Sequence, residues 1–200
     1  MSQVTFASMR GLVHPHVPGC PVPLIDQQLL SMSREFLRRS QAWRVDLDPI
    51  ATVIGQTDYN ITNTSAMTTA KGEVSAVISV TLSDRLLDPF IDYNIGYDGA
   101  VLELVDAPVK VVANAIQIVV AAIPALDATG IESHLYNLWG ETIARGAVYR
   151  LRSVVGKPYF NADGAAYYRA EYGKGLEIAR HREQAGRMQG GLKVAYPGFI

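Results

Sequence analysis

A Gly-Lys-Pro step that begins at Gly156 separates two helix-forming segments, and no other feature of the chain limits its possible folds so strongly. Gly156 can adopt the left-handed conformation that closes a helix, and Pro158 lacks the N–H group that would continue one. Asn161 can cap the next helix with its side-chain oxygen, and Asp163 places negative charge at the positive end of that helix. The pattern predicts a helical hairpin within residues 129–187.

Each helix of the predicted hairpin has an apolar face. The first helix starts at a capping box, Thr129-Gly-Ile-Glu132, whose hydroxyl and carboxylate each satisfy a backbone N–H group at the helix start. Its apolar positions are Leu135, Leu138, Trp139, Ile143, Ala147, Leu151 and Val154. The second helix is predicted from Ala162 to about Arg187. Its apolar positions are Ala165, Tyr168, Tyr172, Leu176 and Ala179.

Another helix is predicted near the start of the chain, over residues 24–44. Four apolar side chains recur there at the spacing of one helix face: Ile25, Leu29, Met32 and Phe36. The preceding residues 1–23 include prolines at positions 15, 18, 21 and 23, which predict an extended N-terminal arm. Residues 24–44 and 129–187 are expected to form one helical domain.

The residues between these helices, 45–128, have the alternation that is typical of β-strands. The clearest case is a predicted strand with one buried face formed by Val74, Ala76, Ile78, Val80 and Leu82. We expect an inserted β-rich domain of four to six strands, mostly antiparallel because the links are too short for helical crossovers. The predicted fold class is therefore α+β. In detail, a small helical bundle, made of the N-terminal helix and the C-terminal hairpin, carries an inserted antiparallel β-rich domain and extended termini.

Composition excludes several classes of protein. Of the 200 residues, 48% are hydrophobic and 18% are charged, which excludes wholesale disorder. No apolar run reaches membrane-spanning length, and we expect no secretory signal in the first twenty residues. The single cysteine, Cys20, excludes an intramolecular disulfide and is typical of a reducing compartment.

The net charge of −1 conceals an uneven distribution of charged side chains. Residues 1–144 carry 8 basic and 15 acidic side chains, a balance of −7, and residues 145–200 carry 10 and 4, a balance of +6. One interpretation is complementary faces on neighbouring copies. The other is that basic helices and acidic loops coincide by chance. Neither part has the cluster of basic residues that is typical of a nucleic-acid-binding protein.

Two groups of side chains could hold metal ions. His14, His16 and Cys20 supply three ligands within seven residues, but the fourth ligand of a zinc site is missing. Six acids, Asp84, Asp88, Asp92, Asp98, Glu103 and Asp106, lack the spacing of a calcium loop and are expected in solvated loops. We therefore predict no metal ion and no cofactor.

The chain contains no nucleophile elbow, P-loop or dinucleotide-binding glycine pattern, and we predict no catalytic residues. Paired carboxylates remain compatible with the sequence, since any two acids can meet in a fold. Tyr167, Tyr168 and Tyr172 with Arg169 could stack on bases, although core and rim positions are more typical of this helical spacing.

The C-terminal tail, residues 188–200, is apolar after a glycine pair. We predict that it binds a neighbouring copy or another partner as an added strand or a groove-filling segment, through Leu192, Val194, Tyr196, Phe199 and Ile200. Packing back on its own domain, or fraying, is the alternative.

Both ends of the chain resemble one known family. The resembling segments are Val17-Pro-Gly-Cys-Pro-Val-Pro-Leu-Ile-Asp26 with Arg34–Arg39 and Trp43-Arg44, then GAVYRL from Gly146 and GKPYFN from Gly156. This pattern, over roughly residues 15–50 and 130–187, resembles the head-to-tail connector adaptors in the neck of tailed bacteriophages. The resemblance implies a non-enzymatic virion protein that forms a ring of about twelve copies beneath the portal protein. Such a ring extends the DNA channel, without sequence-specific DNA binding, and docks the tail or further neck proteins.

Two other functions are compatible with the same residues. A tail-completion or tail-tube component of the virion would also oligomerise. A soluble enzyme or sugar-binding β domain with accessory helices would instead act alone on a bound ligand.

Overall fold

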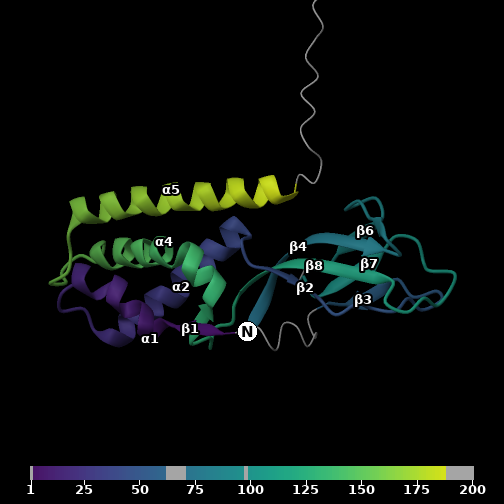
Figure 1. The fold of residues 1–200 in the computed structure, drawn as a ribbon, viewed down its shortest axis with the longest axis horizontal. Coiled ribbons are helices and arrows are strands. Elements are labelled where there is room, and N and C mark those ends of the chain that lie inside the picture. The colour runs from purple at the N-terminus through teal and green to yellow at the C-terminus, as the bar shows by residue number, and fades with distance from the viewer. Residues whose placement is uncertain (1, 62–70, 97–98, 188–200) are drawn as a thin grey trace, which may run out of the picture.

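The structure of the protein is a computed structural model that describes residues 2–61, 71–96 and 99–187 (Figure 1). Helices gather on one side of the molecule, and two of the three sheets extend on the other side. Every described strand pair is antiparallel. The α+β class predicted from the sequence is confirmed.

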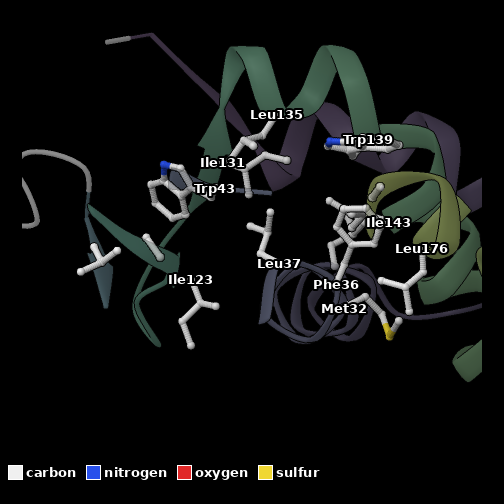
Figure 2. Close-up of a cluster of buried hydrophobic side chains, with 14 of the residues drawn as sticks. Met32, Phe36, Leu37, Trp43, Ile123, Ile131, Leu135, Trp139, Ile143 and Leu176 are labelled. Atoms are coloured by element: carbon white, nitrogen blue, oxygen red, sulfur yellow. The ribbon is translucent and has the colours of Figure 1, made fainter. Parts of the chain in front are cut away.

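Three long helices pack against one another: α2 (Val22–Ser40), α4 (Ser133–Arg152) and α5 (Ala162–Arg187). The four predicted apolar positions of α2 are all fully buried. Phe36 lies at the centre, with its ring 5.6 Å from that of Trp139 and 6.3 Å from that of Tyr172. Figure 2 shows this core continuing past Leu37 to Ile123, so the same apolar core reaches a strand.

The joint between α4 and α5 follows the sequence prediction. Gly156 has a φ of 79°, the left-handed conformation for which glycine is suited. The side-chain oxygen of Asn161 accepts a hydrogen bond of 2.7 Å from the backbone N–H of Gly164, and α5 starts at the next residue after Asn161. The local signals for the end of one helix and the start of the next are thus confirmed.

The predicted capping box at the start of α4 is wrong. Gly130–Glu132 form strand β9, which pairs with strand β1 (Gln3–Thr5), and α4 starts only at Ser133. Glu132 is the N-cap residue, but its side chain makes no capping hydrogen bond. The pairing with β1 occupies the backbone that the capping box would have used. The buried apolar face of α4 is also narrower than predicted, because Leu138 and Val154 are exposed.

The predicted extended arm over residues 1–23 is also wrong. After β1 the chain forms a short helix, α1 (Phe6–Met9), and two 3₁₀ turns, η1 (Arg10–Leu12) and η2 (His14–His16). Its apolar side chains are buried: Phe6, Met9, Val13, Val17 and Cys20. The prolines are compatible with these turns, because they occupy early turn positions where no N–H donor is needed.

Among the described residues, eight strands lie between α2 and α4, and all of them except β9 form two sheets. These seven strands exceed the four to six expected from the sequence. One sheet has the order β2-β8-β4-β5, and the other has the order β3-β7-β6. Their bounds are Arg44–Asp46 (β2), Asp58–Asn60 (β3), Gly72–Leu82 (β4), Arg85–Leu86 (β5), Tyr93–Ile95 (β6), Val101–Leu104 (β7) and Ile116–Pro124 (β8).

Strand β4 does not have the buried face that its alternation predicts. Of the five predicted inward positions, only Val80 is buried. The pairing of β4 with β8 shifts register between Val74 and Ala76 and again between Val77 and Ser79. Because each such irregularity breaks the two-residue alternation, no single face stays inward along the strand. Its partner β8 is mostly buried and leads from the sheet to the helices.

An ion pair ties α2 to the sheet. Arg34 lies 2.9 Å from the carboxylate of Glu73 on β4 and also donates a hydrogen bond to the carbonyl oxygen of Pro124 at the end of β8. The hydrogen bond from Arg34 lowers the pKa of Glu73 below its ordinary value. The side chain of Arg34 thus fixes the helix to two neighbouring strands.

We expect the substitution Glu73→Gln to remove a stabilisation that depends on pH. A carboxylate whose pKa is lower in the folded state stabilises that state above its unfolded pKa, about 4.3, and the contribution is lost as the pH falls through the folded-state value. In urea unfolding, the wild type should therefore be more stable than the variant at neutral pH. The difference should shrink below a pH of about 4. A difference that stays constant with pH would contradict this assignment.

Candidate functional site: the distal loops

Three loops meet at the end of the two sheets that lies farthest from the helices (Figure 1). They comprise residues 50–57, residues 83–92 with the two-residue strand β5, and residues 105–115, and we call them the distal loops. Strand pairing brings them together, since Leu82 of β4 pairs with Ile116 of β8 and Ile50 forms a bridge to the same Ile116.

Backbone hydrogen bonds hold the distal loops to one another. The N–H of Thr52 donates to the carbonyl oxygen of Val112 over 3.0 Å, and the N–H of Val105 donates to the backbone carbonyl oxygen of Asp92 over 2.9 Å. The N–H of Ser83 donates to the carbonyl oxygen of Ala115 over 2.8 Å. Each loop is therefore bonded to another.

The distal loops carry a large share of the exposed apolar side chains. Among the described residues, eight of the sixteen large hydrophobic side chains that are exposed lie on the distal loops. They are Val53, Ile54, Leu86, Phe90, Ile91, Val105, Val109 and Val111. Single exposed apolar residues are common, but a concentration of them on loops that are bonded to one another indicates an interaction site.

Phe90 is the most informative member of this group. Its side chain is 87% exposed, and its backbone has a φ of 67°, the left-handed region that a bulky residue rarely occupies. Such a conformation costs about 1–2 kcal/mol, and an exposed ring recovers little of it by burial. An aromatic residue in this position is understandable if its ring is buried against a partner.

We expect Phe90→Asn to raise the free energy of unfolding of the isolated chain by about 1 kcal/mol, because asparagine tolerates the left-handed conformation. Denaturant unfolding at low protein concentration measures the change. The control is Ile91→Asn, at the next exposed position, where φ is not positive and the change should stay within about 0.5 kcal/mol. Destabilisation by Phe90→Asn would show that the ring supports the fold.

The charge imbalance also divides between the strands and the helices. Residues 44–128, which contain all strands of the two larger sheets, carry 4 basic and 11 acidic side chains, a balance of −7. The described residues outside this range, 2–43 and 129–187, carry 13 and 8, a balance of +5. Within the distal loops, Asp84 and Asp88 are exposed and Asp92 pairs with Arg85 at 2.8 Å. The strand region is therefore acidic and the helical region is basic.

The candidate metal ligands are not brought together. In the described part of the chain, no three His, Cys, Asp or Glu side chains lie close enough to hold a metal ion. His16 instead lies 3.0 Å from the hydroxyl of Tyr168, and Cys20 is buried, which raises the pKa of its thiol. Of the six predicted loop acids, Asp98 lies outside the described residues.

The tyrosines of α5 do not form a row for stacking on bases. Tyr167 is exposed, Tyr168 is half-buried and Tyr172 is buried in the helical core. Burial raises the pKa of Tyr172 to about 12. The guanidinium of Arg169 lies over Tyr149 of α4, 6.0 Å from the ring centre. These residues occupy core and rim positions.

The predicted binding residues of the tail, Leu192, Val194, Tyr196, Phe199 and Ile200, lie outside the described residues. The distal loops were not predicted as a site. Their signal in the sequence is weak: the apolar pairs Phe90-Ile91 and Val111-Val112 resemble ordinary strand residues until the structure places them in loops.

Among the described residues, no helix is both long enough and apolar enough to span a membrane. No protein-family model matches the chain, and no curated protein matches it.

Proposed function

We propose that this protein is a structural protein of a tailed bacteriophage: a head-to-tail adaptor that forms a ring beneath the portal protein, extends the DNA channel and docks the tail. In this function the chain has no catalytic residues and binds no cofactor. Its partners are copies of itself, the portal protein, and the tail or further neck proteins. It is assembled in the host cytoplasm and resides in the neck of the virion, without contact to a membrane.

The strained, exposed Phe90 carries the proposal. A protein that acts as a monomer gains little from an aromatic ring held in water at a cost in backbone energy, whereas a subunit of an assembly gains when a partner covers that ring. The other apolar side chains of the distal loops enlarge the area available for such a contact.

The arrangement of charge also supports assembly from identical copies. An acidic strand region and a basic helical region on one chain attract each other when copies associate head to tail. In the proposed architecture, the helices form a small bundle with the β-rich segment inserted as a second domain, as the adaptor resemblance implies. The twelvefold ring likewise comes from that resemblance.

A tail-completion or tail-tube component is the second candidate, because the distal loops would serve any virion ring equally well. A soluble enzyme or sugar-binding β domain is the third candidate, and binding of a small ligand by the purified monomer would favour it.

The test is to locate the protein in purified phage particles. Mass spectrometry of the particles should detect the chain, and a gold-labelled antibody should mark the neck between capsid and tail. A label along the tail would favour the second candidate. Absence of the chain from particles, together with turnover of a substrate by the purified monomer, would contradict both.

A further inference from the structure

A groove on the helical region has a chemical character complementary to that of the distal loops. It has a volume of about 500 Å³ and lies on α2, beside the end of α4 and the residues that follow β8. It is lined by Gln27, Leu30, Ser31, Arg34, Glu35, Arg38, Leu126 and Arg150.

The charge of the groove is positive, with three arginines and one glutamate. Arg34 is paired with Glu73, and Arg150 binds Glu35 as well as the hydroxyl of Ser31 at 2.9 Å. Arg38 is exposed and forms no ion pair within 4.0 Å with any described residue, although its charge helps to lower the pKa of Glu73. The groove therefore offers a guanidinium group to an incoming carboxylate.

The groove is also apolar at its edge. Leu126 is 73% exposed, and Leu30 is partly buried beside the arginines. A segment that fits this groove must combine a carboxylate with large apolar side chains.

The segment from Asp88 to Asp92 meets both requirements. Phe90 and Ile91 are exposed, and the carboxylate of Asp88 has no hydrogen-bond partner among the described residues. We propose that this segment of one copy docks in the Arg34–Arg38–Arg150 groove of a second copy, with Phe90 against Leu126 and Asp88 facing Arg38.

The contact is heterologous, because it joins two different surfaces of the same chain. Such a contact repeats from copy to copy and closes into a ring when the rotation allows it. The inference rests on the proposed function, which requires a ring but does not say which surfaces form it.

The first experiment is a directed cross-link. Cys20 is the single cysteine and is buried, so Phe90→Cys and Leu126→Cys each introduce one exposed thiol. Under mild oxidation of an equal mixture of Phe90→Cys chains and size-tagged Leu126→Cys chains, we expect the mixed dimer as the main product, at least fivefold above either homodimer. The control pairs Phe90→Cys with Ile178→Cys, an exposed position on α5, and should give no excess of mixed dimer.

The second experiment reverses the two charges. Arg38→Glu and Asp88→Arg should each weaken self-association at least tenfold in sedimentation velocity, and the double variant should restore most of it. The matched controls are Arg182→Glu and Asp46→Arg, two exposed residues outside both surfaces, which should associate like the wild type.

The outcomes separate this inference from the proposed function. Mixed dimers in no excess over homodimers, or charge reversals that associate normally, would overturn the docking contact. The location of the protein in the neck would then stand, with other surfaces forming the ring. A main mixed dimer together with rescue by the double reversal would support the contact.

Discussion

Replacement of Phe36 by alanine is expected to lower the free energy of unfolding by about 3–5 kcal/mol. Phe36 is fully buried, and its ring packs against the rings of Trp139 on α4 and Tyr172 on α5. The truncation removes the apolar side chain that all three long helices share and leaves a cavity, because a core held by three helices collapses only in part. Thermal and urea unfolding of the purified chain measure the loss.

The control is Phe90→Ala, which removes the same side chain from an exposed position and should change stability by less than about 0.5 kcal/mol at low protein concentration. A loss below about 1 kcal/mol for Phe36→Ala would mean that the packing of the three helices is not what stabilises this chain.

The double substitution Phe90→Ser with Ile91→Ser is expected to weaken self-association strongly while leaving the fold intact. Central apolar residues of an interface contribute about 2–4 kcal/mol, so association should weaken by about 30- to 700-fold. Both side chains are exposed in the single chain, so their removal opens no cavity. Sedimentation velocity over a range of concentrations measures association, and circular dichroism verifies the fold.

The matched control is Val154→Ser with Val155→Ser, a neighbouring pair of exposed apolar residues in the joint between α4 and α5. These variants should associate like the wild type. If both pairs weaken association equally, the effect comes from the loss of any exposed apolar side chains and is not specific to the distal loops.

The helices were predicted well because their signals are local. The spacing of Ile25, Leu29, Met32 and Phe36 places them on one helix face whatever else the chain does, and all four are buried. The joint at Gly156 and Asn161 likewise depends on conformations and caps within a few residues.

The errors arose where distant segments compete for the same backbone. The capping box at Thr129 does not form because β9 pairs with β1, whose residues lie more than a hundred positions earlier in the chain. The register shifts along β4 depend on its partner β8. The prolines of the N-terminal segment are compatible both with an extended arm and with the turns that form, and the sequence alone does not distinguish the two. Such pairings depend on tertiary contacts and leave no local pattern.

The candidate site was the least predictable part. The charge imbalance was visible in the sequence, but its division between strands and helices required the fold. The exposure of Phe90 and its positive φ depend on how three loops meet, and adjacent Phe and Ile residues are more typical of a buried segment.

Imaging of the purified wild-type chain at high concentration, alone and with the portal protein, tests most directly whether this protein buries its distal loops against partners. We expect closed rings in at least one of the two samples, with Phe90 of each copy covered by a neighbouring chain. Solitary molecules in both samples, with Phe90 still exposed to solvent, would contradict the account.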